Sequence, residues 1–550
     1  MNNLAQLLLQ WQQTPQKILY RQYVDQAWRD YDAAAVLALA ARWQAGFRAA
    51  GLKVGDRMAL CLKNGVQWVA ADMAAHGLGL VVVPLYVDDN ADNMAWCLED
   101  SGAALLIADH LRFMPALQKA MGDLPQIVLV RGEPSAPAIA AENWLPVKAS
   151  SFVIEPRAAD ALATIVYTSG TMGRPKGVML SHRNILANVA AILEVHPIHA
   201  TDVLLSVLPL SHMFERTGGY YLPLHAGASV TYCRGISELA QDMAEQRPTV
   251  IMAVPRLFER MLARIDERLA QSGLQRFLFY LAAQAGWRRF KGEARFYDLP
   301  LIRLLHPRIA APLLARLGGR LRQAVMGGAA LDRRVAETLI GLGVPLLQGY
   351  GLTEASPVVA VNRNDNNDPA SVGEPLPGIE TRISASGELL VRGATVMQGY
   401  WNNAAATHKV IDGAGWLNTG DIVEVRQRRI YIRGRSKNIL VLSNGEKIAP
   451  EDIESAVLED AAFEQVMVIG EARPFLVLVA VSANDDEQAL LRRANERIRH
   501  LPRYARIRRV IVLKEAWSVE SGLLTSTLKI RRTAVYERYL PQIEQVYRGA

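Results

Sequence analysis

Glycines, hydroxyls and one lysine are concentrated in the segment YTSGTMGRPKGV, residues 167–178. Glycine lets consecutive backbone N–H groups curl around phosphate oxygens, so this composition is typical of an anion-binding loop. A Walker A loop requires G-x-x-x-x-G-K-[ST], whereas here Pro175 precedes Lys176 and Gly177 follows it. The segment is therefore either a phosphate-binding loop of another kind or an ordinary glycine-rich turn.

Six further segments carry residues suited to chemistry on anions. They are LPLSHMFERTGGY (208–220), MGGAAL (326–331), LLQGYGLTEAS (346–356), GWLNTGD (415–421), IRGRSKNILVLSNGEKIAPEDIE (432–454) and SGLLTSTLKIRR (521–532). Together with the first loop, and in this order, they resemble the acyl-adenylate-forming superfamily of acyl-CoA synthetases, peptide-synthetase adenylation domains and luciferases. The resemblance covers essentially the whole chain. HMFERTGG, QGYGLTE, GLLTSTLK and a long insertion before MGGAAL are most similar to long-chain fatty acyl-CoA synthetases.

This resemblance implies a two-step reaction. A fatty acid, expected to be long-chain, first attacks the α-phosphate of ATP to give acyl-AMP and pyrophosphate. The acyl group then passes to the thiol of coenzyme A. Two anions must meet in the first step and a third must leave, so catalysis depends on positioning and charge neutralisation. The implied co-substrates and cofactor are ATP, coenzyme A and Mg²⁺.

The resemblance places the β- and γ-phosphates on the first loop. Its contacting residues are then Thr168, Ser169, Gly170, Thr171, Gly173 and Lys176. Glu354, with Thr168 nearby, is the implied Mg²⁺ ligand, and one carboxylate suffices because magnesium keeps several waters. Thr353 is expected to hydrogen-bond the α-phosphate. Met172 departs from the family loop, which usually has Thr, Ser or Glu at this position, so one polar group near the phosphates is missing.

The adenosine part of ATP is expected to lie among residues of four motifs. They are Gly327, Gly328, Gly349, Tyr350, Gly351, Asp421 and Arg435. Tyr350 supplies a flat face for adenine, and the glycines at 327–328 allow close approach on the other side. Asp421 is expected to accept both ribose hydroxyls, a bidentate task suited to a carboxylate, and Arg435 to support the same sugar.

Lys529 is the implied catalytic residue that bridges the substrate carboxylate and the α-phosphate. One lysine cannot occupy the carboxylate site while coenzyme A approaches the same carbon, so family members rotate the C-terminal domain between the two steps. Carried over to this chain, the hinge residue is Lys437. After rotation, the pantetheine tunnel is expected to be lined by Ser443, Asn444 and Gly445.

His212 in the HMFERTGG motif has two interpretations. The family often has a histidine or an aromatic residue here beside the acyl carboxylate, which implies a catalytic role. The alternative is a structural histidine with its hydrogen bonds satisfied. Glu215 and Arg216 of the same motif are expected to shape the loop rather than to do chemistry.

Short apolar runs alternate with helical patterns along most of the chain. They lie at 58–63, 80–86, 104–108, 127–130, 161–166, 204–210, 228–233, 250–254 and 344–347. Such alternation predicts an α/β architecture with largely parallel, buried strands. Beyond Arg435 the pattern predicts a helix from Pro450, a strand pair at 466–481 and a helix near 486–499.

These patterns predict two domains, and the resemblance implies that the first binds the adenylate and that the second is mobile about a hinge. Residues 1–434 form a large, multi-layer α/β domain that binds the adenylate and carries a β-rich appendage at about 357–434. Residues 438–550 form a small, mobile α+β domain that closes over it, and the hinge lies at about 435–437.

The composition limits the compartment and the partners. The three cysteines, Cys61, Cys97 and Cys233, are well separated and indicate neither a disulfide framework nor a zinc site. The first residues lack a signal-peptide pattern, and no uncharged apolar stretch is long enough to span a bilayer. We therefore expect a cytoplasmic protein. A net charge of +7 favours anionic ligands or an anionic membrane surface.

Two basic regions leave alternatives open. Residues 271–312, aromatic and basic, suit peripheral contact with the inner face of a membrane, or a helical pair packed on the body with a solvated basic face. Residues 491–510 hold eight arginines but no nucleic-acid motif, so attraction for the 3′-phosphate of coenzyme A or a solvated face is expected instead. The pattern does not specify an oligomer, and a homodimer is one option.

The main expectation is a fatty acid–CoA ligase. The nearest alternative is a fatty acyl-AMP ligase that loads an acyl carrier protein. Such enzymes tend to carry an insertion that blocks rotation, and none is evident near Lys437. A luciferase-like adenylating oxygenase shares the same motifs and differs in its acyl pocket. A non-catalytic membrane-associated binding protein is disfavoured because Lys176, Glu354 and Lys529 are all retained.

Overall fold

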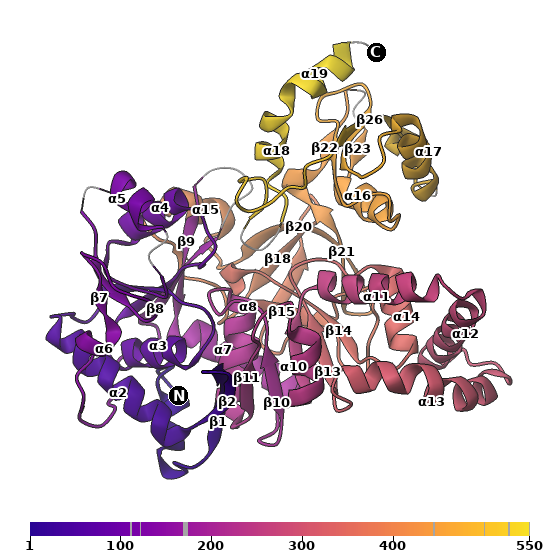
Figure 1. Ribbon diagram of the computed structural model, residues 1–550. Coiled ribbons are helices and arrows are strands. Elements are labelled where there is room, and N and C mark those ends of the chain that lie inside the picture. The colour runs from indigo at the N-terminus through magenta and orange to yellow at the C-terminus, as the bar shows by residue number, and fades with distance from the viewer. Residues whose placement is uncertain are drawn as a thin grey trace.

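The computed structural model describes residues 1–110, 113–121, 123–168, 174–443, 446–499, 501–525 and 529–548, without the side chains of residues 116, 437, 447 and 504. A small C-terminal domain lies on top of a large body, with the elements β18, β20 and β21 between them (Figure 1). The mixed α/β architecture expected from the sequence is confirmed.

An eight-stranded sheet forms one layer of the body, in the order β19-β9-β8-β4-β3-β5-β6-β7. Its strands are β3 (Arg57–Cys61), β4 (Val81–Pro84), β5 (Ala103–Ala108), β6 (Gln126–Leu129), β7 (Ile139–Ala140), β8 (Leu162–Thr168), β9 (Lys176–Ser181) and β19 (Gly399–Tyr400). The six strands from β3 to β8 are parallel, whereas β9 and β19 run antiparallel to their neighbours.

A nine-stranded sheet forms a second layer, in the order β16-β15-β14-β13-β12-β10-β11-β1-β2. Its strands are β1 (Ile18–Val24), β2 (Ala27–Asp32), β10 (Val203–Ser206), β11 (Ser229–Tyr232), β12 (Val250–Ala253), β13 (Gln323–Met326), β14 (Leu346–Gly351), β15 (Val358–Val361) and β16 (Glu374–Pro375). The central strands are parallel, and antiparallel pairs close both edges. The hairpin β1–β2 was not expected from the sequence.

Helices fill the space between the two sheets and cover their outer faces. The longer ones in the body are α2 (Ala33–Ala49), α3 (Val66–Leu78), α4 (Ala91–Ser101), α7 (His182–Val195), α10 (Leu239–Gln246), α11 (Pro255–Leu269), α12 (Gly273–Phe290), α13 (Asp298–Arg316) and α14 (Arg333–Gly341). One apolar core joins α2, α3 and α7 to both sheets. Because strand side chains alternate, Val250 and Met252 enter this core while Ile251 and Ala253 face a second core under α10–α14.

A four-stranded antiparallel sheet lies beside these layers, in the order β17-β18-β20-β21. It comprises β17 (Glu380–Ile383), β18 (Glu388–Arg392), β20 (Leu417–Arg426) and β21 (Arg429–Arg435). The β-rich part was expected from residue 357 onward, but β15, β16 and β19 pair with the two large sheets rather than with this one. These short strands pair with free sheet edges, which satisfies their backbone groups.

The small domain follows β21. It contains a strand pair, β22 (Leu440–Val441) and β23 (Lys447–Ile448), and a three-stranded sheet of β24 (Gln465–Ile469), β25 (Leu476–Val481) and β26 (Ile507–Leu513). Its helices are α16 (Pro450–Leu458), α17 (Glu487–Arg497), α18 (Arg532–Arg538) and α19 (Leu540–Arg548). The helix from Pro450, the strand pair and the helix near 486–499 are confirmed. Strand β26 was missed because two consecutive exposed arginines, Arg508 and Arg509, interrupt its apolar residues.

In the part of the chain that the structure describes, no helix is long and apolar enough to cross a membrane.

Candidate active site

Three of the sequence motifs meet at the carboxyl ends of the parallel strands in the nine-stranded sheet. His212 follows β10, Gly327 follows β13 and Thr353 follows β14. These strands belong to one parallel set, so their carboxyl ends lie at the same edge. In open α/β sheets this edge is where ligands bind.

Three residues expected at the nucleotide are in direct contact. The Tyr350 hydroxyl donates to Asp421 Oδ2, and Arg435 Nε donates to Asp421 Oδ1 at 3.0 Å. Strands β20 and β21 place Asp421 and Arg435 opposite each other, and Asp421 is buried. Burial, followed by the Asp421 charge, raises the pKa of Tyr350, so the phenol stays protonated and able to donate.

Glycines allow close packing of the backbone at the carboxyl ends of β13 and β14. A Cβ atom on Gly351 would lie 2.0 Å from the Pro357 carbonyl oxygen, and one on Gly327 would lie 3.3 Å from the Phe214 ring. Gly328 has a φ of +85°, a conformation that favours glycine. Gly349 lies within β14 beside Tyr350. Larger side chains at 351 and 328 would shift the chain that carries Tyr350 and Thr353.

The phosphate-loop candidate joins two antiparallel strands. Thr168 ends β8 and lies opposite Lys176, which begins β9. Ser169, Gly170, Thr171, Met172 and Gly173 lie outside the described residues. A P-loop passes from a strand into a helix, whereas this loop returns into a strand, which accounts for the failed Walker A match.

Lys176 and Glu354 are brought together by Tyr400, which the sequence motifs did not indicate. Lys176 Nζ lies 5.0 Å from the centroid of the Tyr400 ring, and the Tyr400 hydroxyl donates to Glu354 Oε1 at 2.9 Å. The pairing of β19 with β9 places Tyr400 opposite Val178, two residues from Lys176. Burial and the Glu354 charge raise the pKa of Tyr400 and keep its proton available for this bond. The phosphate-loop lysine and the candidate metal carboxylate therefore share one support.

Lys529, on the small domain, interacts electrostatically with Arg435 and Asp421. It lies at the base of a turn in which Thr525 N donates to Lys529 O at 2.8 Å and Leu524 bridges to Ile530. Its pKa is lowered by desolvation and then by the positive charge of Arg435, while Asp421 acts in the opposite sense. Lys529 is exposed, and the influence of Arg435 and Asp421 on its pKa shows that the ammonium lies within electrostatic range of both residues.

His212 lies within electrostatic range of the same lysine. Burial, and then the charge of Lys529, lower the pKa of His212 to about 4, so the imidazole is neutral near neutral pH. Its Nδ1 accepts from the Phe214 backbone N–H at 3.3 Å, which caps helix α8 (Met213–Glu215) and leaves the proton on Nε2. The structural and catalytic interpretations are therefore compatible, since one nitrogen caps the helix and the other carries a proton.

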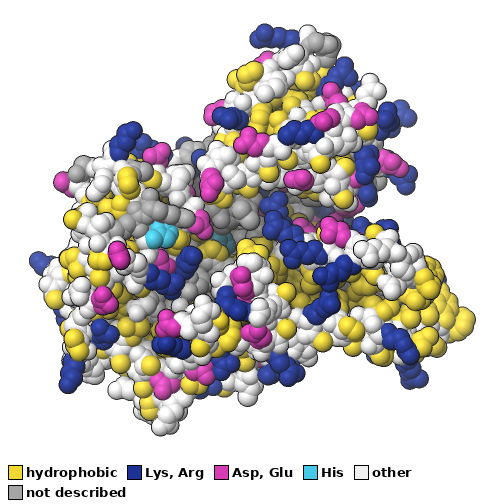
Figure 2. Space-filling model, viewed as in Figure 1, with side chains coloured by type: hydrophobic (Ala, Val, Ile, Leu, Met, Phe, Trp, Pro, Cys, Tyr) yellow, Lys and Arg dark blue, Asp and Glu magenta, His cyan; other side chains and the backbone are white. Residues whose placement is uncertain are grey.

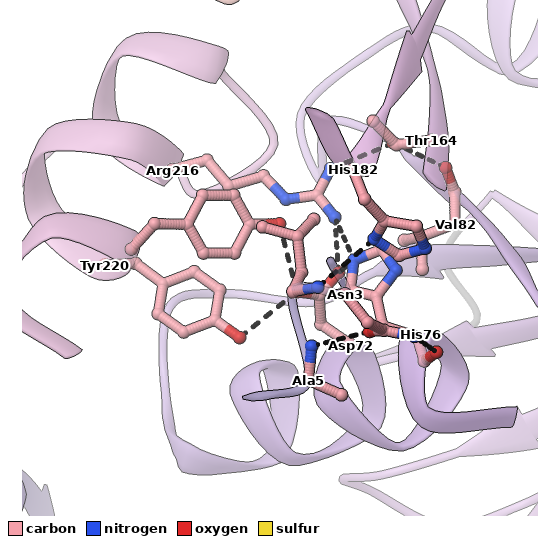
Figure 3. A network of polar contacts seen from close by, with 11 residues as sticks. Asn3, Ala5, Asp72, His76, Val82, Thr164, His182, Arg216 and Tyr220 are labelled. Atoms are coloured by element: carbon pink, nitrogen blue, oxygen red, sulfur yellow. Dashed lines mark hydrogen bonds and ion pairs between the residues drawn. The ribbon is translucent and has the colours of Figure 1, made fainter. Parts of the chain in front are cut away.

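A buried ion pair lies one helical turn after His212 in the chain. It involves Arg216, for which the sequence had indicated only a loop-shaping role. Arg216, in the π-helical turn η2 (Arg216–Tyr221), pairs with Asp72 of α3, and both side chains are fully buried (Figure 3). Arg216 Nη1 also donates to Thr164 Oγ1 of β8 at 3.0 Å. The Tyr220 and Tyr221 hydroxyls donate to the other Asp72 oxygen.

This network fastens the His212 segment to the strand that leads into the phosphate loop. Burial opposes ionisation of Asp72, but the charges of Arg216 and His76, together with their hydrogen bonds to the carboxylate, outweigh burial and lower the pKa of Asp72 to about 2. His76 Nε2 lies 3.3 Å from the same carboxylate. The signal in the sequence was the pair Asp72 and His76, polar residues four positions apart in a helix that is apolar from Trp68 onward apart from them.

The hinge and tunnel candidates lie at the start of the small domain. Lys437 is the middle residue of a short 3₁₀ turn, η4 (Ser436–Asn438), directly after Arg435; its side chain is not among the described ones. Ser443 is exposed and its backbone N–H donates to the Arg473 carbonyl oxygen at 2.9 Å. Asn444 and Gly445 lie outside the described residues.

Among the described residues, no three metal-ligating side chains gather at one point. Glu354 fits the other kind of magnesium site, in which one carboxylate and the substrate phosphates hold the ion and water completes its shell. The Tyr400 hydroxyl takes only one lone pair of this carboxylate, so the side chain retains acceptor capacity.

The fold, with Tyr350, Asp421 and Arg435 grouped on the large body and Lys529 on the small domain, is that of an adenylate-forming enzyme. Family models match the chain at residues 8–401 (AMP-binding enzyme) and 437–550 (AMP-binding enzyme C-terminal domain), and the chain belongs to the AMP-binding enzyme family.

The particular relatives are fatty acid ligases. The chain is 30% identical to the long-chain-fatty-acid–CoA ligase FadD15 of Mycobacterium bovis, over 97% of this chain and 95% of that protein. It is 27% identical to the chloroplastic long-chain-fatty-acid–[acyl-carrier-protein] ligase AEE15 of Arabidopsis thaliana, over 91% and 80% of the two chains.

Solved structures share the fold. The A domain of carboxylic acid reductase from Segniliparus rugosus, in complex with AMP, superimposes with a TM-score of 0.79 at 21% identity, covering 100% of this chain and 94% of that one. ATP-bound MatB from Rhodopseudomonas palustris superimposes with a TM-score of 0.77 at 23% identity, covering 98% and 99%.

Proposed function

We propose that the protein activates a long-chain fatty acid with ATP to give acyl-AMP and pyrophosphate, and then transfers the acyl group to coenzyme A. The proposal is supported by the electrostatic influence that Lys529, on the small domain, has on His212 and that Asp421 and Arg435 have on Lys529. A mobile ammonium at that point can neutralise the carboxylate and the α-phosphate as they meet. The relatives named as fatty acid ligases support the choice of acid.

Each cluster of side chains has its own part in the first step. Tyr350, Asp421 and Arg435 hold adenosine, with Asp421 accepting from the ribose hydroxyls. Thr168 and Lys176 face the outer phosphates, and Thr353 faces the α-phosphate. Glu354 holds Mg²⁺, which neutralises phosphate charge when bound. Neutral His212 presents its Nε2 proton to the acyl carboxylate, where it donates a hydrogen bond without adding a second full charge beside Lys529.

The second step requires Lys529 to leave. We propose that the small domain, residues 438–550, rotates about Lys437 relative to residues 1–434. The turn at Ser443, Asn444 and Gly445 then faces the acyl-adenylate and guides the pantetheine arm. The arginines of 491–510 supply positive charge for the phosphates of coenzyme A. We place the reaction in the cytoplasm.

Pyrophosphate release tests the proposal. A series of straight-chain acids from acetate to oleate is supplied with ATP and Mg²⁺, first without and then with coenzyme A. We expect release to increase with chain length and acyl-CoA to form only when coenzyme A is present. A protein that releases no pyrophosphate with any acid of the series contradicts the assignment.

A carrier-protein acceptor is the second candidate, because one relative is named as a long-chain-fatty-acid–[acyl-carrier-protein] ligase. Supplying holo acyl carrier protein instead of coenzyme A separates the two. Acyl transfer to the carrier alone would replace the coenzyme A assignment, and consumption of O₂ after adenylation would indicate the oxygenase class.

A further inference from the structure

Exposed apolar side chains are concentrated on α12 and α13. Of the fifteen large hydrophobic residues that are exposed in the described chain, six lie within residues 274–304: Leu274, Phe277, Phe290, Phe296, Leu299 and Leu304. Phe296 is 91% exposed and Phe277 63%. Figure 2 shows hydrophobic side chains gathered over the end of the molecule that these helices form. Contiguous apolar surface of this kind marks an interaction site.

This surface is held on a rigid support. The opposite side of α12 is buried through Phe279, Ala282 and Ala283. Gly286 of α12 packs so closely on α14 that a Cβ atom there would lie 1.8 Å from the Gly341 carbonyl oxygen. The outward side chains are therefore presented by helices that are fixed to the body.

The same segment of the chain is strongly basic. Residues 273–316 contain eight Lys and Arg against two acidic residues, a net charge of +6, when the whole chain carries +7. Both acidic residues are already paired, Glu293 with Lys291 and Asp298 with Arg288. Among the described residues, no carboxylate pairs with the exposed arginines of this segment, among them Arg276, Arg289, Arg295 and Arg303.

We propose that α12 and α13 dock the protein on an anionic lipid bilayer. Phe277, Phe296 and Leu299 enter the boundary between headgroups and acyl chains, and the unpaired arginines contact lipid phosphates. A second copy of the chain is disfavoured as the occupant, because a twofold contact through this surface would bring two charges of +6 together. The inference goes beyond the proposed function, since it concerns where the protein binds and not which acid it activates.

Vesicle sedimentation tests the docking without ATP, acid or coenzyme A. The full chain is mixed with vesicles of phosphatidylcholine alone or of phosphatidylcholine with phosphatidylglycerol. We expect binding to the anionic vesicles only, and less of it as ionic strength rises. Phe277→Gln/Phe296→Gln/Leu299→Gln should lower the partition coefficient about tenfold for each side chain lost from the interface. Arg289→Gln/Arg295→Gln/Arg303→Gln should lower it about a hundredfold.

Matched controls change the same residue types elsewhere. Val147→Gln/Ile236→Gln replaces exposed apolar residues, and Lys53→Gln/Lys148→Gln replaces exposed cations, all outside α12 and α13. Both should bind as the parent does, and all variants should keep the parental melting temperature. Absence of parental binding overturns the proposal, as does equal binding to neutral vesicles or an equal loss in the controls. Self-association that disappears in the apolar variant without any vesicle binding assigns the surface to a second copy instead. Because lipid binding is measured apart from catalysis, failure of the proposed reaction leaves this result unaffected.

Discussion

At the scale of single residues, the proposed reaction depends on the placement of charge rather than on a protein nucleophile. Asp421 is shared between Tyr350 and Arg435, and Lys529 comes from another domain to complete the group. The proposed reaction joins two anions, so one movable positive charge can separate its two steps. This division of labour is open to test.

Lys529→Ala should lower the rate of acyl-AMP formation about 10²–10³-fold, because one preorganised charge is lost from the transition state. Thioester formation from supplied acyl-AMP should be spared, since Lys529 is then away from the site. Pyrophosphate release and acyl-CoA formation measure the two steps separately. Equal losses in both steps would show that Lys529 does not act in adenylation alone.

The pH profile of the parent adds an independent readout for Lys529. Its pKa is lowered, so the ammonium is present at low pH and is lost as pH rises through a value below that of an ordinary lysine. Adenylation should fall along the same alkaline limb.

At the scale of elements, the candidate phosphate loop connects the antiparallel strands β8 and β9, and the hinge candidate is a single turn after β21. The sequence predicted β8 from the short apolar run at 161–166, and it placed β21 within a β-rich region, but it did not predict β9. It did not predict β19, whose two residues become a strand only because β9 offers a free edge. Tyr400 was missed for the same reason, because nothing in its local sequence places it near Lys176 and Glu354.

Motifs and tertiary contacts differ in how far they can be predicted. The residues of the site follow one another in motifs, so their order along the chain carried the prediction. The buried network of Asp72, Thr164 and Arg216 joins three elements far apart in the chain. Only the polar positions within an apolar helix hinted at it, and their partners come from the packing of two sheets.

Lys437→Pro should leave adenylation nearly intact and block transfer to coenzyme A. Proline fixes φ near −65°, which a 3₁₀ turn accepts, but it removes the rotation that a hinge requires. Lys437→Ala is the matched control and should support both steps, because it changes the side chain and not the backbone. Acyl-CoA formation at the parental rate in the proline variant would show that rotation occurs elsewhere.

At the scale of the whole molecule, two large sheets share one core, and a buried charge pair joins α3 to η2 within it. The same interior holds neutral histidines. Desolvation lowers the pKa of His182 to about 3 and that of His196 to about 4, and His212 behaves likewise. Each of these groups binds a proton more readily in the unfolded chain than in the folded one.

The free energy of unfolding should therefore fall as pH drops below about 6.5, because these histidines bind protons in the unfolded chain at a pH where they remain neutral in the folded one. The fall should approach 1.4 kcal/mol per pH unit for each such histidine. His182→Gln should make the dependence of melting temperature on pH shallower between pH 6.5 and 4. His408→Gln, on the exposed face of α15 (Ala404–Val410), should leave it unchanged. A parental slope in the His182 variant contradicts the assignment.

The hydrogen bonds that Tyr350 and Arg435 make to Asp421 have a consequence for product release. The ribose hydroxyls proposed to bind Asp421 must compete with the Tyr350 hydroxyl for the same carboxylate. When AMP leaves, the Tyr350 hydroxyl can again donate its hydrogen bond to Asp421. Self-replacement of this kind moderates nucleotide affinity and speeds the exit of AMP. Tyr350→Phe keeps the ring but removes the competitor, so AMP should leave about fivefold more slowly, the worth of one net hydrogen bond. Displacement of a fluorescent AMP analogue in a stopped-flow instrument measures this rate. Unchanged or faster release would mean that the Tyr350 hydroxyl does not compete with the ribose for Asp421.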